Sequence, residues 1–228
     1  GETTLGAIDN IYRHQISLAS KIHFTSTLDY KFRVESLVKS DKNVFDVGAL
    51  SLSNIEKFTA IGKKEFFSNF KIKDAPYCLI TFHPETNVLE ENVDFAKEMK
   101  KALEYLSRSI NLVITMPNAD TLGSVYRKEL NQLKITNPEK VFLVENFGKE
   151  NYFSAMYYSQ FLLGNTSSGI IEAASFGKYF LNIGERQKGR LQSNNTFNAI
   201  FTKNDIIENS LKILSLGNYE EENIYYKK

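Results

Sequence analysis

A segment rich in glycine and hydroxyl side chains, residues 164–169 (GNTSSG), leads into a predicted helix over 168–176. Small residues let backbone N–H groups approach an anion, hydroxyls add donors, and a helix N-terminus supplies a favourable dipole. The segment therefore predicts a phosphate-binding loop made by Thr166, Ser167, Ser168 and Gly169. It lacks the lysine of a P-loop and the G-x-G-x-x-G of a dinucleotide-binding fold. Simple N-capping of the helix by Ser or Thr is the alternative that the residues leave open.

Glu172 follows Ser168 by four residues and lies on the same face of the predicted helix. A carboxylate there can accept hydrogen bonds from the two hydroxyls of a ribose, as acidic residues do in other nucleotide sites. Arg186 and Arg190 follow the next predicted strand, and they are two of six arginines in a chain with 22 lysines. A rigid guanidinium suits phosphate or a base, whereas a surface ion pair is the alternative for each arginine.

His83 precedes Pro84 at the end of a predicted strand. Its position suits a phosphate contact or a proton transfer, and a hydrogen-bonded structural role is the alternative. His14 and His23 lie in a different region, and no ligand spacing links the three histidines, so no metal site is predicted. Cys78 is the only cysteine, lies in an apolar run and is predicted to be buried.

Short apolar runs alternate with helical patterns from residue 77 onward. The runs are 77–82, 111–116, 141–145, 161–164 and 179–183. Helices are predicted near 88–108, 121–135, 150–159, 168–176 and 204–214. This alternation is typical of a mostly parallel sheet with helices on both faces, in which ligands bind beyond the carboxyl ends of the strands. The polar residues named above, other than His14 and His23, follow such runs, so we expect them to share one edge of the sheet.

The two ends of the chain are patterned differently. Helices are predicted over 5–22, 28–38 and 63–69, and short strands over 23–27 and 43–50. At the other end, Tyr225 and Tyr226 lie in a charged tail and are predicted to be peripheral.

The composition excludes several classes of partner. The 228 residues include 28 Lys and Arg against 27 Asp and Glu, a balance that gives no footprint for duplex nucleic acid and no polybasic membrane patch. No apolar run approaches the roughly 18 residues of a membrane helix and no secretory signal opens the sequence, so a cytoplasmic setting is expected. Gly1 stands first and the three methionines lie far from it, which predicts a piece of a longer protein. Removal of an initiator Met before Gly1 is the alternative.

Five motifs in order resemble the hydrolysing UDP-N-acetylglucosamine 2-epimerases of sialic acid and related nonulosonic acid biosynthesis. They are GETTLGAID at 1–9 with YRH at 12–14, TFHP at 81–84, PNAD at 117–120, GNTSSGIIE at 164–172 and IGERQKGR at 183–190. The matches run from Gly1 to the region of Asn195 and so cover most of the chain.

The resemblance implies an α/β fold of GT-B type, in which two Rossmann-like domains face a cleft and the second holds the uridine nucleotide. Catalytic roles are expected for Asp9, Glu2 and His83. Substrate-binding roles are expected for Arg13, His14, Asn118, Thr166, Ser167, Ser168, Gly169, Glu172, Arg186 and Arg190. Among these, Glu172 matches the ribose-binding glutamate, and Asn118 matches a residue on the uridine side.

The implied reaction eliminates UDP across C1–C2 of UDP-N-acetylglucosamine and adds water, which gives free N-acetylmannosamine and UDP. A carboxylate must abstract the weakly acidic C2 proton, and Asp9 matches one such position. A UDP-diacetamido-6-deoxy sugar is an alternative substrate. No cofactor is implied, and the full-length parent is expected to form a homodimer.

The same resemblance divides the chain. Residues 1–70 are expected to be the tail of a truncated first Rossmann-like domain with a crossing segment, 71–215 one complete UDP-binding domain, and 216–228 a tail. In the family a C-terminal helix crosses back to the first domain, which also supplies further carboxylates, so this chain alone is expected to be weakly active or inactive. A GT-B glycosyltransferase donor domain and a non-catalytic nucleotide-sugar-binding module are the alternatives.

Overall fold

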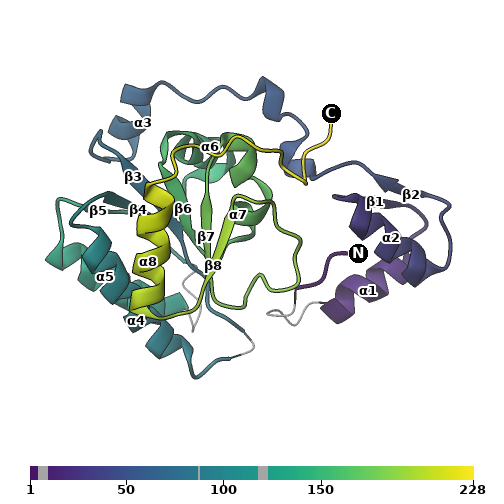
Figure 1. Ribbon diagram of the computed structural model, residues 1–228, viewed down its shortest axis with the longest axis horizontal. Helices are drawn as coiled ribbons and strands as arrows, with labels where there is room; N and C mark the ends of the chain where they lie inside the picture. Colours follow the sequence, from purple (N-terminus) through teal and green to yellow (C-terminus); the bar gives the residue numbers. More distant parts are fainter. Residues whose placement is uncertain (5–9, 87, 118–122) are drawn as a thin grey trace.

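The computed structural model describes residues 1–4, 10–86, 88–117 and 123–228 as a large α/β unit with a smaller unit at one side (Figure 1). The large unit contains a six-stranded sheet in the order β5-β4-β3-β6-β7-β8, and every neighbouring pair is parallel. The strands are β3 (Tyr77–Thr81), β4 (Asn111–Thr115), β5 (Val141–Val144), β6 (Phe161–Gly164), β7 (Phe180–Ile183) and β8 (Thr196–Ala199). The five predicted strands are confirmed, and β8 was missed.

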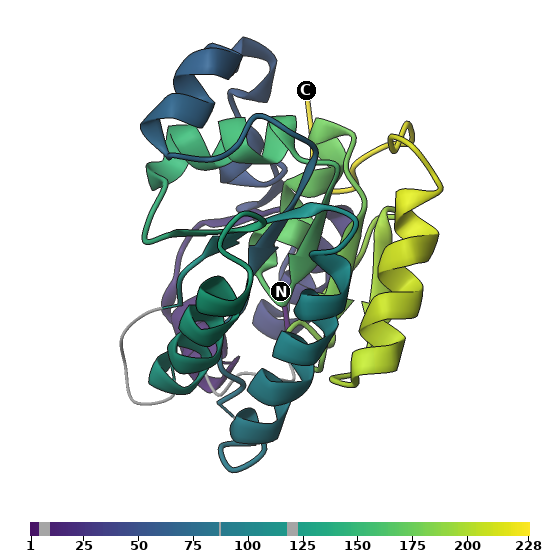
Figure 2. The same ribbon diagram turned by 90° about the vertical axis from the view of Figure 1, so that its left-hand side faces the viewer.

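Helices cover both faces of this sheet (Figure 2). Cys78 and Ile80 of β3 pack in the cluster that includes α4 (Asn92–Leu106), α5 (Gly123–Thr136) and α8 (Lys203–Leu214). Tyr77 and Leu79 pack in the opposite cluster with α3 (Lys63–Asn69), α6 (Gly148–Tyr158), α7 (Ser167–Ile171) and the 3-10 turn η3 (Ala173–Phe176). Successive strand side chains point to opposite faces, so a strand buried on both faces reads as one continuous apolar run.

The smaller unit contains α1 (Asn10–Ala19), β1 (His23–Thr25), α2 (Leu28–Val38) and β2 (Val44–Asp46), with β1 and β2 paired in parallel. Two 3-10 turns, η1 (Leu50–Leu52) and η2 (Ile55–Lys57), lead from it to α3. The side chain of Thr27 accepts a hydrogen bond from the Tyr30 N–H and so caps α2. The predicted bounds of α2 and α3 are confirmed, and the first five residues of the helix predicted over 5–22 lie outside the described residues.

Large apolar side chains of the smaller unit are exposed in unusual number. They are Ile11, Tyr12, Ile16, Leu18, Ile22, Phe24, Leu28, Phe32, Phe45, Val47 and Leu50. Phe24 of β1 and Phe45 of β2 stack on each other, with ring centroids 5.9 Å apart. Parallel sheets are almost always covered on both faces, so this unit presents an uncovered apolar surface.

The C-terminal segment, residues 216–228, returns to the smaller unit without forming a helix. The Tyr225 carbonyl accepts a hydrogen bond from the Ala49 N–H at 2.8 Å, and the Tyr225 and Tyr30 hydroxyls lie 3.1 Å apart. The prediction that Tyr225 is peripheral is wrong, because its ring is fully buried between the two units. The charged residues around Tyr225 suggested an exposed position, because its contacts with Tyr30 and Ala49 involve residues far away in the chain. None of the helices in the described ranges is long and apolar enough to cross a bilayer.

Candidate functional site

Three loops follow the neighbouring strands β3, β6 and β7 at the carboxyl edge of the sheet. His83 lies after β3, residues 164–169 begin at the end of β6, and Arg186 lies after β7. Because β3 pairs with β6 and β6 pairs with β7, the three loops are adjacent. The expected shared edge is therefore confirmed for these loops. Asp9 and Asn118 lie outside the described residues.

The side chain of Asn165 ties the loops after β3 and β6 together. Its Oδ1 accepts a hydrogen bond from the His83 N–H, and its Nδ2 donates to the His83 carbonyl, each at 2.7 Å. The Asn165 carbonyl also accepts hydrogen bonds from Nη1 of Arg186 at 3.1 Å and Nε2 of Gln187 at 2.7 Å. Asn165 is fully buried. The sequence did not predict this role of Asn165. The only signal was that Asn165 lies between Gly164 and Thr166 in the predicted loop.

Glu85 holds the loop after β7 from the other side. Its Oε1 accepts hydrogen bonds from the Glu185 N–H at 2.8 Å and the Arg186 N–H at 3.2 Å. Burial raises the pKa of Glu85, and these two backbone hydrogen bonds oppose the rise. Arg186 is therefore fixed both through its backbone and through its guanidinium.

The hydroxyl-rich loop begins a short helix. Thr166 is the N-cap of α7, and its hydroxyl accepts a hydrogen bond from the Ser168 N–H at 3.3 Å. Thr166 therefore caps the helix, and the predicted phosphate-binding role of this loop stays a prediction. Gly169 lies directly against β7, because a Cβ at this position would overlap the ring of Phe180. This close approach places Ser167 and Ser168 at the sheet edge.

Glu172 ends α7 one turn after Ser168, and its N–H donates to the Ser168 carbonyl at 2.9 Å. Its Oε1 accepts a hydrogen bond from the Ser51 hydroxyl at 2.6 Å, and the residue is 8% exposed. Burial raises the pKa of Glu172, while hydrogen bonds from Ser168 and Ser51 favour the charged form and oppose the rise. A buried carboxylate with hydroxyl donors beside it is suited to accept hydrogen bonds from a sugar diol.

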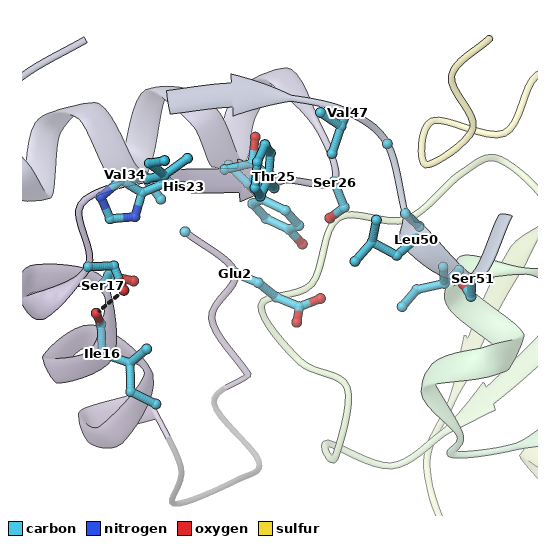
Figure 3. Close-up of a pocket in the computed structure, with 18 residues that line it drawn as sticks. Glu2, Ile16, Ser17, His23, Thr25, Ser26, Val34, Val47, Leu50 and Ser51 are labelled. Atoms are coloured by element: carbon cyan, nitrogen blue, oxygen red, sulfur yellow. Dashed lines mark hydrogen bonds between the residues drawn. The ribbon is translucent and has the colours of Figure 1, made fainter. Parts of the chain in front are cut away.

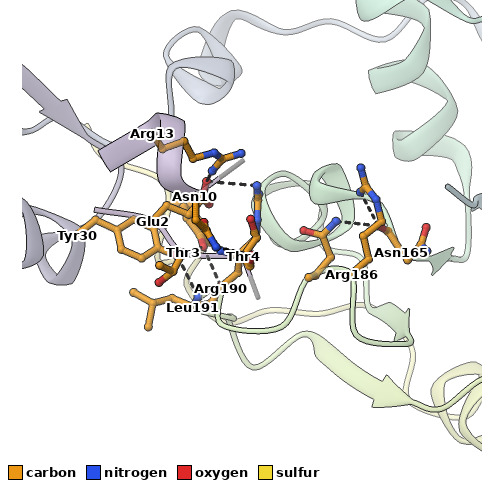
Figure 4. A network of polar contacts seen from close by, with 12 residues as sticks. Glu2, Thr3, Thr4, Asn10, Arg13, Tyr30, Asn165, Arg186, Arg190 and Leu191 are labelled. Atoms are coloured by element: carbon orange, nitrogen blue, oxygen red, sulfur yellow. Dashed lines mark hydrogen bonds and ion pairs between the residues drawn. The ribbon is translucent and has the colours of Figure 1, made fainter. Parts of the chain in front are cut away.

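A second polar cluster joins the two units (Figure 4). Oε2 of Glu2 lies 2.9 Å from Nη1 of Arg13 on α1 and 3.2 Å from Nη2 of Arg190 after β7. The Arg190 side chain is 8% exposed, and its Nε and Nη1 have no hydrogen-bond partner among the described residues. The Glu2 side chain thus lies between two guanidinium groups, and its predicted catalytic role stays a prediction.

Two cavities lie near this cluster. One of about 500 Å³ is lined mostly by the smaller unit and the segments next to it, including Glu2 and Ser51, and also by Ile171 of the large unit (Figure 3). The other, of about 640 Å³, is lined in part by His14 and Arg33. His14 therefore borders a different cavity from Ser51. No group of three His, Cys, Asp or Glu side chains in the described part of the chain could hold a metal ion.

Residues 1–228 match the family described as UDP-N-acetylglucosamine 2-epimerase. A GDP/UDP-N,N'-diacetylbacillosamine 2-epimerase (hydrolyzing) from Campylobacter jejuni is 36% identical over 87% of this chain. A polysialic acid biosynthesis protein from Escherichia coli is 31% identical over 91% of this chain. The chain spans 52% of the length of each of these two relatives.

Among solved structures, the UDP-GlcNAc 2-epimerase from Neisseria meningitidis bound to UDP-GlcNAc is similar, with a TM-score of 0.73 and 20% sequence identity. The likeness covers 98% of this chain and 64% of that one. It confirms the α/β fold of GT-B type expected from the sequence, with a complete Rossmann-like sheet.

Proposed function

Because the chain belongs to the UDP-N-acetylglucosamine 2-epimerase family, we propose that it is the nucleotide-binding portion of a hydrolysing UDP-sugar 2-epimerase. The observation that carries the proposal is Glu172, a buried carboxylate that receives a hydroxyl hydrogen bond beside the loop containing Ser168. A nucleoside diphosphate has the complementary chemistry, since it combines a diol with two phosphates.

The loops around the site give each part of UDP a partner. Glu172 accepts hydrogen bonds from the ribose hydroxyls, while Thr166, Ser167 and Ser168 face the diphosphate. Arg186, fixed by Glu85 and Asn165, supplies positive charge beside the same loop. The expected positions of Asn118 on the uridine side and of His83 near the phosphates complete the proposed site.

The proposed substrate is UDP-N-acetylglucosamine or a UDP-diacetamido-6-deoxy sugar. The name of the Campylobacter jejuni relative contains diacetylbacillosamine, and the Neisseria meningitidis structure contains UDP-GlcNAc. The reaction removes the C2 proton, breaks the C1–O bond to release UDP, and adds water to the resulting double bond. The product is the free sugar with inverted configuration at C2, and Asp9 is the proposed base.

The uncovered surface of the smaller unit supports the proposal that residues 1–70 include part of an incomplete first domain, although the last helix of that range, α3, packs on the large sheet. Phe24, Phe45 and Leu50 are exposed there, beside a sheet of only two strands. In the full-length parent, the rest of a first Rossmann-like domain would cover this surface, supply further carboxylates and form the homodimer contact. No contact in the described part of the chain favours a glycosyltransferase domain or a non-catalytic module over the epimerase.

Calorimetric titration with UDP tests the proposed site. Wild-type protein should bind UDP, and Glu172→Ala should weaken binding by about 1–3 kcal/mol because charge-assisted hydrogen bonds to the ribose are lost. Glu104→Ala, on the exposed side of α4, is the matched control and should bind as the wild type does. Unchanged affinity in Glu172→Ala would remove the ribose role.

The rate of UDP release should distinguish this chain from a full-length family member. The chain alone should release UDP from UDP-N-acetylglucosamine far more slowly than a full-length family member, since catalysis is expected to need carboxylates of the first domain in addition to Asp9. A coupled assay for UDP and a chromatographic assay for free N-acetylmannosamine measure this. Turnover comparable with that of a full-length enzyme would contradict the proposal, and a sugar transferred to an acceptor would favour the glycosyltransferase.

A further inference from the structure

One contact joins the proposed ribose-binding carboxylate to a segment outside the large sheet. The Ser51 hydroxyl donates to Oε1 of Glu172 at 2.6 Å, although the two residues are 121 positions apart. Ser51 belongs to η1, which follows β2 of the smaller unit, and Glu172 ends α7 of the large unit. Both residues border the interface between the units, and Ser51 lines the cavity shown in Figure 3.

We propose that Ser51 is a positioning residue for nucleotide binding: its hydroxyl holds the Glu172 carboxylate in the orientation that receives the ribose. The inference rests on the proposed nucleotide site and adds a residue outside the large sheet, Ser51, on which that site depends. Binding of UDP to the large unit then depends on the position of a segment that leads out of the smaller one.

The segment around Ser51 is held firmly enough for this role. Leu52 is 1% exposed and packs in the core cluster that also contains Tyr225. The Leu52 N–H donates to the Ala49 carbonyl at 2.9 Å, and the Ala49 N–H donates to the Tyr225 carbonyl at 2.8 Å. Gly48 has a positive φ of 76°, and a Cβ there would lie 3.1 Å from Lys227. The C-terminal segment therefore fixes the turn that carries the hydroxyl.

Several groups act on Glu172 besides Ser51. The Ser168 hydroxyl from α7 and the positive charges of Arg190 and Lys149 favour the charged form. The partly buried Tyr152 side chain from α6 lies nearby. Burial raises the pKa of Glu172 against all of these contributions. Loss of the Ser51 donor removes one contribution that favours the charged form, so the pKa of Glu172 should rise further.

A consequence for UDP binding follows from this direction. As the pH is lowered, protonation of Glu172 removes an acceptor from the ribose hydroxyls, and affinity falls. In Ser51→Ala the decline should begin at a higher pH than in the wild type, because the carboxyl is protonated earlier. The phosphate of UDP titrates in the same pH range. Its effect on affinity is the same for every variant, so it does not contribute to the difference between variants.

The experiment compares three variants of the chain from about pH 5 to about pH 8. Ser51→Ala should weaken UDP binding by about threefold to tenfold at neutral pH, and by more at the acid end. Ser51→Thr keeps the hydroxyl and should restore most of the affinity. Ser53→Ala is the matched control, since the Ser53 hydroxyl donates to the Leu50 carbonyl in the same turn and the residue is exposed.

A second measurement does not depend on UDP. In protein labelled with carboxyl-¹³C glutamate, the Glu172 resonance is assigned by its absence from Glu172→Gln. Its titration midpoint should move to higher pH in Ser51→Ala and stay in place in Ser53→Ala. If the wild type binds UDP and Glu172→Ala weakens binding, while Ser51→Ala matches the wild type in affinity and midpoint, the inference is wrong and the nucleotide site stands. If the wild type does not bind UDP, both fail together.

Discussion

Gly164→Ala should lower the free energy of unfolding by about 2–5 kcal/mol and abolish UDP binding. Gly164 ends β6 with a φ of +143°, a conformation that L side chains rarely adopt, and a Cβ there would overlap the carbonyl of Thr81 on β3. The alanine methyl must therefore push β6 away from β3. That movement displaces the loop of residues 164–169 from both neighbouring loops.

Urea denaturation followed by circular dichroism measures the effect on stability. Gly62→Ala is the control, because its backbone has φ of −52° and a Cβ there meets only Glu65, at 4.0 Å. This substitution should change the free energy of unfolding by less than about 1 kcal/mol. A similarly small effect for Gly164→Ala would show that the close approach of β3 and β6 is not required.

Asn165→Ala should lower the free energy of unfolding by about 2–4 kcal/mol and weaken UDP binding about tenfold or more. The substitution removes both hydrogen bonds to the His83 backbone, each 2.7 Å long, and leaves a donor and an acceptor without their partner in a half-buried loop. The loops after β3 and β6 then lose their link, although the Asn165 carbonyl can still receive Arg186.

Asn194→Ala provides the comparison for this prediction. The Asn194 side chain also donates an amide hydrogen bond, from Nδ2 to Oε2 of Glu221 at 2.7 Å, but both residues are exposed. Water can replace that partner, so its loss should cost less than about 1 kcal/mol. UDP titration below the melting temperature of each variant separates loss of binding from loss of folding. Equal behaviour of the two variants would contradict the special role of Asn165.

Several contacts described above were beyond prediction for one physical reason. Ser51 and Glu172 are 121 residues apart, and Tyr30 and Tyr225 are 195 apart, so no local pattern links either pair. The link between Asn165 and His83 depends on β6 pairing with β3, although β4 and β5 lie between them in the chain. Strand order is decided by packing of the whole sheet, and hydrogen-bond partners across loops follow from strand order.

The strand β8 shows the limit of local patterns within a single element. Thr196–Ala199 alternates polar and apolar residues, and three of its four residues are not buried, because it closes the edge of the sheet beside β7. An edge strand needs no continuous apolar run, and an alternation of only four residues is too short to distinguish a strand from a loop. The central strands are covered on both faces, so their sequences are continuous apolar runs that can be recognised as strands.

The sequence by itself determined the α/β class, five of the six strands of the large sheet, and the segments that meet at its carboxyl edge. It could do so because burial on both faces requires apolar runs, and because polar residues after parallel strands must share one edge. The tertiary structure alone decided which polar groups touch: Asn165 with His83, Glu2 with two arginines, and Ser51 with Glu172. Those pairings join distant segments, and only the packed sheet brings the segments within hydrogen-bond distance.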